Sequence, residues 1–134
     1  MALQFSDDVR NAMLDSVEVT LGASPILRLR TGAPPATVAT ADSGTIVAEM
    51  TLPADFMAAA SGGSKAKSGT WQDTAANAAG TVGHFRIYTS GGVAKVQGTV
   101  TATGGGGDMT LDSNVVALNQ VVTITGFTLS AANA

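Results

Sequence analysis

The segment GHFRIYTSGGVAKVQGTVT, residues 83–101, decides the fold class. Two runs of β-forming residues, 83–89 and 93–101, flank the tripeptide Ser90-Gly91-Gly92. A short glycine-containing turn between two such runs is typical of a β-hairpin. We therefore expect the rest of the chain to pack on, or extend, the sheet that this hairpin begins.

Further strands are predicted on both sides of this hairpin. Alternating or β-forming composition marks residues 25–31, 45–52, 70–72, 108–111 and 120–129. In the first of them, Leu27 and Leu29 are expected to face the core, while Arg28 and Arg30 face outward. In the last, the apolar phase changes at Gly126, which predicts a β-bulge or bend there. Short strands separated by turn signals favour a mainly antiparallel β-sandwich, jelly-roll-like, with one N-terminal α-helix.

The helix is predicted over residues 7–20. Ser6 is placed to cap its first turn, and Asp7 and Asp8 complement the positive end of the helix dipole. Gly22 is placed to end the helix. One apolar stripe follows at intervals of four residues, formed by Val9, Met13, Val17 and Leu21. The stripe either packs on the sheet or docks on another subunit, and the pattern alone leaves both open.

Three segments are predicted to be irregular. Residues 55–60 form either one helical turn or a loop anchored by Phe56, residues 61–69 are flexible in composition, and residues 73–83 read as a loop. We expect one domain over residues 1–134, with an N-terminal arm and helix in 1–22 and the β-sandwich in 25–134.

The composition excludes several function classes. The chain has 134 residues, 45% of them hydrophobic and 13% charged, which favours a folded chain over disorder. A net charge of −3 with seven scattered basic residues gives no footprint for nucleic acid. Neither a membrane-spanning run nor a secretion signal is recognisable. The absence of cysteine indicates synthesis in a reducing cytoplasm, which is compatible with a surface structure assembled there.

No set of residues predicts catalysis, a cofactor or a metal. His84 is the only histidine and no nucleophile-elbow motif accompanies it, so we expect a structural or surface role. Asp108, Asp112 and Asn114 do not have the spacing of an EF-hand loop and read as turn residues. Glu49 has the chemistry of a general acid but no recognisable partner carboxylate.

Two binding functions remain open from the residues. Trp71 and Tyr88, with outward Thr and Gln side chains, could form a sugar-binding strip of a carbohydrate-binding module. Core burial of Trp71 is the competing interpretation. Alternatively, the chain is a part of an assembly, since its surface is rich in Thr, Ala and Gly and poor in charge.

Several segments resemble small virion proteins of tailed bacteriophages. They are FSDDVRNAMLD (5–15), RTGAPP (30–35), ASGGSKAKSGTW (60–71), HFRIY (84–88) and GDMTLD (107–112). The resemblance implies a non-enzymatic structural protein of the particle, most specifically a head decoration or cement protein. A tail, collar or fibre component of the same virion is the alternative that the resemblance leaves open.

The same resemblance implies partners and a location. The partners are the major capsid protein and neighbouring copies of the chain itself, without nucleic acid or membrane, on a capsid surface assembled in the host cytoplasm. Leu3 and Phe5 would anchor an N-terminal docking arm, and Val9 and Met13 would continue it along the helix. A hydrophobic staple of Phe5 on Val9 or on the stem of Arg10 is the alternative for that residue.

Overall fold

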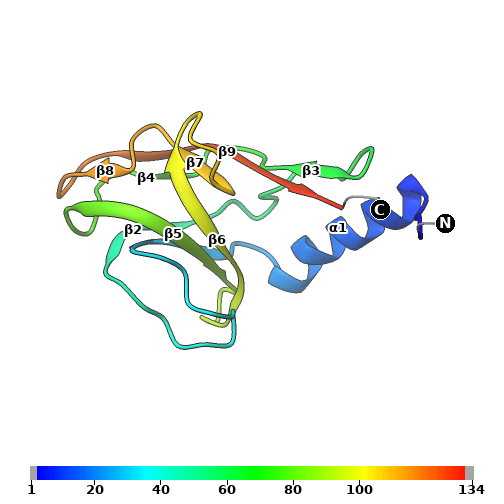
Figure 1. Ribbon diagram of the computed structural model, residues 1–134, viewed down its shortest axis with the longest axis horizontal. Helices are drawn as coiled ribbons and strands as arrows, with labels where there is room; N and C mark the ends of the chain where they lie inside the picture. Colours follow the sequence, from blue (N-terminus) through cyan, green and yellow to red (C-terminus); the bar gives the residue numbers. More distant parts are fainter. Residues whose placement is uncertain (1–2, 132–134) are drawn as a thin grey trace.

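The computed structural model describes residues 3–131 as a mainly β fold, with one helix in that range (Figure 1). The helix precedes all the strands. The elements are α1 (Asp7–Leu21), β1 (Ile26–Thr31), β2 (Ile46–Thr51), β3 (Ser64–Ala66), β4 (Gln72–Asp73), β5 (Gly80–Tyr88), β6 (Ala94–Ala102), β7 (Met109–Leu111), β8 (Val115–Val116) and β9 (Val122–Ser130).

The strands form one continuous curled sheet. Its order is β2-β1-β5-β6-β7-β9-β3, while β4 pairs with β9 and β8 pairs with β5. All neighbours are antiparallel except β6 and β7, which run parallel from Val100↔Met109 to Ala102↔Leu111. The curl places β1, β2 and β5 opposite β4 and β9, and α1 lies at one end beside β3 (Figure 1). The predicted hairpin over residues 83–101 is confirmed as β5–β6, and the β-rich class with one helix is confirmed as well.

The core fills the space inside the curl. Its aromatic members form a chain of ring contacts: Phe56 to Trp71 at 6.2 Å, Trp71 to Phe127 at 5.6 Å, and Phe127 to Phe85 at 5.4 Å between centroids. Each such ring contributes about 1.5–3 kcal/mol by leaving water. These contacts join the two sides of the curl, because Phe85 belongs to β5 and Phe127 to β9.

The helix begins and ends where the sequence predicts. The Ser6 hydroxyl accepts a hydrogen bond from the N–H of Val9 at 3.4 Å, and Asp7 and Asp8 occupy the first turn. Gly22 has a φ of 76° and donates its N–H to the carbonyl oxygen of Glu18 at 3.0 Å. The left-handed φ favours glycine at this position because it has no Cβ to clash.

The segment at 61–69 is not a flexible loop as predicted. Gly62 and Gly63, with φ of 59° and 76°, form the turn of a tight hairpin closed by hydrogen bonds between Ser61 and Ser64, and β3 follows. Two successive positive φ angles are what a two-residue turn between strands requires. β3 then pairs with the end of β9, so the glycines shape this segment.

Arg30 lies on the outer face of β1, as predicted, but it is buried there rather than exposed. The reason is that the loop at 32–45 folds over the outer face of β1, β5 and β6, so this face is covered as well. The loop predicted over residues 73–83 is wrong at both ends, because Asp73 belongs to β4 and β5 already begins at Gly80. Of the two alternatives for residues 55–60, the loop anchored by the fully buried Phe56 is confirmed. The irregularity predicted at Gly126 is confirmed, because Thr110↔Gly126 is followed by Leu111↔Ile124.

Candidate interaction surface

Polar residues of α1, rather than an apolar face alone, hold the helix on the body of the protein. Lys65 of β3 is 2% exposed, and its Nζ lies 2.6 Å from Asp15 Oδ1 and 2.8 Å from Glu18 Oε2. The same Nζ donates to the carbonyl oxygen of Ala58 at 2.9 Å. These bonds tie the middle of the helix to the β3 hairpin.

Two more contacts extend this docking toward the start of the helix. Asn11 Oδ1 accepts the N–H of Gly63 at 2.9 Å. Arg10 Nε donates to the carbonyl oxygen of Ala131 at 2.6 Å, which places the first half of α1 beside the C-terminal end of β9. Leu14 and Leu21 are the buried apolar residues of the helix.

These contacts shift the pKa values of Lys65 and Asp15. Burial alone would lower the pKa of Lys65, but hydrogen bonds from its ammonium to Asp15 and Glu18, and their charges, raise it above its usual value. The hydrogen bond from Lys65, supported by the N–H of Ala60, lowers the pKa of Asp15. The buried ammonium is therefore kept charged by its two carboxylate partners.

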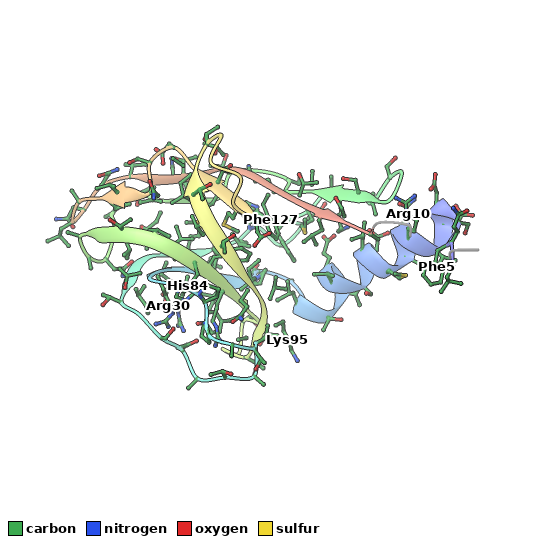
Figure 2. The ribbon with its side chains drawn as sticks, in the orientation of Figure 1. Phe5, Arg10, Arg30, His84, Lys95 and Phe127 are labelled. Carbon is green, nitrogen blue, oxygen red and sulfur yellow. The ribbon has the colours of Figure 1, made fainter. Side chains whose placement is uncertain are left out.

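The apolar stripe of the helix is divided between the core and the surface. Leu21 is buried and Val17 packs against the core, whereas Val9 is 43% and Met13 46% exposed. In the arm before the helix, Leu3 is 72% and Phe5 40% exposed. The four predicted interaction residues, Leu3, Phe5, Val9 and Met13, are therefore exposed or partly exposed apolar groups of the arm and the first half of α1. Figure 2 shows Phe5 at the end of the molecule.

A groove opens next to this end, between β6 and β9. It has a volume of about 390 Å³ and is bounded by Val96 and Gln97 of β6 and by residues 127–130 of β9, with Phe85 at its floor and Asp108 at one end. Figure 2 shows Phe127 between the two strands. A smaller hollow, bounded by Val17 and Thr20 of α1 and by Lys95 and Val96, lies beside it. We call the larger space the β6–β9 groove.

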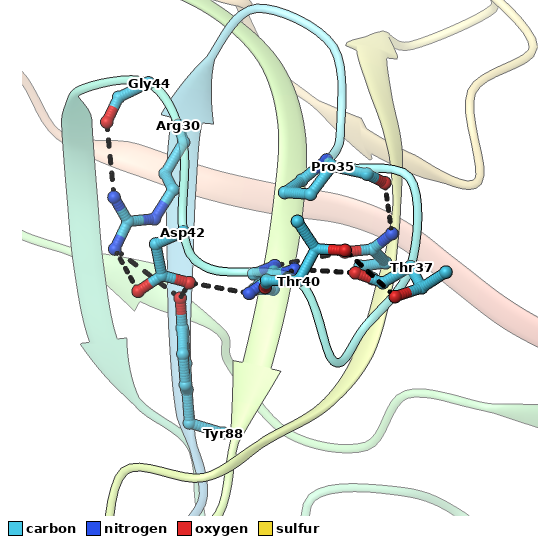
Figure 3. A network of polar contacts seen from close by, with 9 residues as sticks. Arg30, Pro35, Thr37, Thr40, Asp42, Gly44 and Tyr88 are labelled. Atoms are coloured by element: carbon cyan, nitrogen blue, oxygen red, sulfur yellow. Dashed lines mark hydrogen bonds and ion pairs between the residues drawn. The ribbon is translucent and has the colours of Figure 1, made fainter.

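The outer face of β1, β5 and β6 is closed by a polar network (Figure 3). Asp42 accepts hydrogen bonds from Arg86 Nη1 at 2.8 Å, from Tyr88 Oη at 2.7 Å and from Arg30 Nη2 at 3.0 Å. Arg86 Nη2 also donates to the carbonyl oxygens of Thr37 and Thr40, at 3.0 and 2.8 Å. The network holds the loop at 32–45 on the strands.

The Asp42 carboxyl is kept ionised by this network. Its partial burial would raise its pKa, but hydrogen bonds from Tyr88 and Arg86, together with the charges of Arg30 and Arg86, lower the pKa below the ordinary 3.8. Two buried guanidinium groups thus share one carboxylate, and the donors of Arg86 are further satisfied by loop carbonyls and by Gln97.

The other candidate residues are placed as structural groups. His84 is fully buried and its Nδ1 lies 2.9 Å from the carbonyl oxygen of Gly32. Trp71 and Tyr88 are both buried, so the proposed sugar-binding strip does not exist as an exposed surface. Glu49 is paired with Arg28 at 2.6 Å.

The predicted turn residues behave as such. Asp108 accepts the N–H and the hydroxyl of Thr99, both at 2.9 Å, and Asp112 accepts the N–H of Ser113. Over residues 3–131, no three His, Cys, Asp or Glu side chains are grouped as a metal site would need. In the same range, no helix has the length and apolar character needed to cross a membrane.

Sequence reasoning missed the role of Lys65 and the existence of the β6–β9 groove. A lysine in a Gly- and Ser-rich segment reads as solvent-exposed, and only the spacing of Asp15 and Glu18 on one side of the helix hints at a buried cation. The groove depends on how far β7 extends between two longer strands, which no local pattern encodes.

Comparison of the chain with known proteins identifies no relative. The chain matches no family model, no curated protein sequence and no solved structure.

Proposed function

We propose that this chain is a structural protein of a tailed-bacteriophage particle that binds the outer surface of the head in many copies and stabilises it. One observation carries the proposal. The helix uses polar and charged residues to dock on its own domain, and Val9 and Met13 remain partly exposed beside the exposed arm residues Leu3 and Phe5. Four exposed or partly exposed apolar residues within eleven positions of the chain, residues 3–13, favour a protein contact site at the start of the helix.

The roles of the buried charged residues favour a binding protein over an enzyme. Asp42, Arg30 and Arg86 fix a loop, and Lys65 fixes the helix. A rigid domain with one apolar end suits attachment to a large surface, where repeated shape-matched contacts supply the affinity. The resemblance of scattered segments to phage virion proteins points the same way.

The remaining expectations belong to this proposal. The partners are the major capsid protein and neighbouring copies, the location is the capsid surface, and the alternative is a tail, collar or fibre component. We also propose that the curled sheet has the architecture of a jelly-roll-like sandwich, because β1 and β5 lie opposite β9 across the aromatic core.

Cosedimentation with undecorated heads tests the function. We expect saturable binding at hundreds of copies per particle, because a decoration protein repeats with the capsid lattice. A few to a dozen copies would place the protein at the tail, the collar or a single vertex. Absence of binding to any part of the particle would overturn the virion role.

Variants of the helix locate the contact. The double variant Val9→Asp/Met13→Asp should weaken head binding by at least about tenfold, since it places two charges in an apolar contact. Val19→Asp is the matched control, because Val19 is 80% exposed on another side of the same helix. Equal loss in both variants would contradict the assignment of this surface.

A further inference from the structure

The β6–β9 groove is a strand position that the chain itself leaves empty. β7 lies between β6 and β9, pairing with β6 through Val100↔Met109 and with β9 through Met109↔Phe127. Within residues 3–131, both ladders end at Met109, although β6 extends back to Ala94 and β9 runs on to Ser130. The groove is the continuation of the position that β7 occupies for three residues.

The β9 side of the groove presents backbone hydrogen-bonding groups. The N–H of Lys67 donates to the carbonyl oxygen of Phe127, and the N–H of Ala131 donates to that of Gly63. The backbone N–H and C=O groups of residues 127, 129 and 131 therefore point toward β3. Because alternate residues of a strand bond to opposite sides, the N–H and C=O groups of Thr128 and Ser130 point into the groove.

The β6 side presents the same kind of edge. The N–H of Thr99 points away from β5, because it donates to Asp108 Oδ2 at 2.9 Å. Gln97, two residues earlier, therefore also directs its N–H and C=O into the groove. Unpaired backbone groups on strand edges pair readily with an added strand. The edges of β6 and β9 that line the groove are therefore suited to bind an extended peptide.

Asp108 and Gly98 shape the closed end of the groove. The Asp108 carboxylate takes both donors of Thr99, so an added strand cannot pair beyond that residue. A Cβ on Gly98 would lie 2.7 Å from the Phe85 ring and 2.9 Å from Asp108 Oδ2. The missing side chain lets the Phe85 ring approach the floor of the groove.

The floor of the groove is apolar and suits side chains spaced two residues apart. Val96 and Leu129 are partly buried and pack against the core, and Phe127 lies beneath them in contact with Phe85. On an added strand, residues i and i+2 face this floor, while the residue between them faces solvent. The occupant should therefore have apolar residues at alternate positions.

The arm Leu3–Ser6 has this pattern. Leu3 and Phe5 are apolar and two residues apart, with the polar Gln4 between them, and Ser6 is extended with φ −63° and ψ 160°. In a single copy the arm lies at the end of α1, outside the groove, and Leu3 is 72% exposed. The arm carries no charge from residue 3 to residue 6, which fits an apolar floor.

We propose that the β6–β9 groove binds the arm Leu3–Ser6 of a second copy as an added β-strand. Leu3 and Phe5 lie on Val96, Phe127 and Leu129, and the arm backbone bonds to the edges of β6 or β9. The contact is head-to-tail, because the arm and the groove are different surfaces, so it can link copies in a ring or a row. This inference does not depend on the virion function.

Site-specific disulfides in the full chain test this contact, since the protein has no cysteine of its own. Phe5→Cys protein is mixed with Val96→Cys protein under mild oxidation, and the mixed dimer is separated from each homodimer by a mass tag. The matched controls replace Phe5→Cys by Gln4→Cys, on the opposite side of the arm, or by Val19→Cys on the helix. We expect the Phe5–Val96 pair to form mixed dimer at least about tenfold faster than either control.

Each outcome decides the proposal. Equal rates for Phe5→Cys and for both controls would overturn it, as would absence of mixed dimer. If instead the double variant Phe5→Cys/Val96→Cys closes a disulfide within one chain, the arm folds back on its own groove and the second-copy occupant is wrong. Head cosedimentation reports separately on the virion role, so either proposal can fail alone.

Discussion

Asp42 joins three side chains from two strands, accepting hydrogen bonds from Arg30 of β1 and from Arg86 and Tyr88 of β5. Its two basic partners are buried, while about a third of the Asp42 side chain stays exposed. Removing the carboxylate would leave two guanidinium groups without their anion under the loop at 32–45. A single exposed residue therefore determines whether two buried charges are tolerated.

We predict that Asp42→Asn lowers the free energy of unfolding by about 2–3 kcal/mol near pH 7. This is less than the loss for a fully buried pair, because water reaches the carboxylate. The lowered pKa of Asp42 contributes stability that is present above the ordinary value of 3.8 and is lost as pH falls through the folded-state pKa. The difference between wild type and variant should therefore shrink as the pH is lowered below 3.8.

Urea unfolding near pH 7 and below pH 3.8 measures this difference. Asp55→Asn is the control, because Asp55 is exposed in the loop after β2 and should give no difference at either pH. A stability gap between wild type and Asp42→Asn that does not change with pH would show that the charge of Asp42 is not what holds the loop.

The docking of α1 on β3 adds polar contacts to the usual arrangement of a surface helix, in which apolar residues such as Leu14 and Leu21 are buried. Here Asp15 and Glu18 face Lys65, and Asn11 receives the N–H of Gly63, while Val9 and Met13 are partly exposed. The helix is thus attached by directional bonds that fix its orientation. Of its apolar residues, Val9 and Met13 stay partly exposed, whereas Leu14 and Leu21 are buried.

We predict that Lys65→Met lowers the free energy of unfolding by about 1–3 kcal/mol, because three charge-assisted or backbone bonds are lost while the buried stem is retained. The double variant Asp15→Asn/Glu18→Gln should destabilise more, since it leaves the ammonium of Lys65 buried without a counter-charge. Amide exchange of Gly63 and Ala60, whose N–H groups bond to the helix, reports undocking directly.

Lys95→Met is the matched control for this element, because Lys95 is exposed on β6 and should change stability by no more than about 0.5 kcal/mol. If Lys65→Met and Lys95→Met unfold alike, the ion pairs do not hold the helix. If Lys65→Met is less stable than Asp15→Asn/Glu18→Gln, the buried uncompensated charge of Lys65 is not the main source of destabilisation.

Local patterns predicted the elements that depend on neighbouring residues. The cap at Ser6, the stop at Gly22, the hairpin β5–β6 and the irregularity at Gly126 all follow from propensity, periodicity and turn chemistry. The burial of Arg30 and Lys65 could not be predicted, because their partners lie in a loop and a helix distant in the chain. The parallel pairing of β7 with β6, which ends the groove, is likewise a long-range choice.

At the scale of the whole molecule, two complementary surfaces lie near one end. The β6–β9 groove opens where β7 no longer lies between β6 and β9. The start of α1 lies beside the end of β9 (Figure 1). If the arm binds a neighbouring copy as proposed, Val9 and Met13 remain for a different contact. One copy would then bind its neighbour and a larger surface at once, which would raise the avidity of an array.

Self-association through the arm should make thermal stability depend on concentration, because a partner that binds only the folded state stabilises it by mass action. We predict that Tm of the wild-type protein rises by about 5–10 °C over a hundredfold increase in concentration. At every concentration, Leu3→Ala/Phe5→Ala should have the Tm that the wild type has at the lowest concentration, since both contacts of the arm with the groove floor are removed. Gln4→Ala should follow the wild type, because that side chain faces solvent on an added strand. Calorimetry across the concentration series separates these cases: a flat wild-type curve, or a double variant that rises with the wild type, would show that the arm does not join copies.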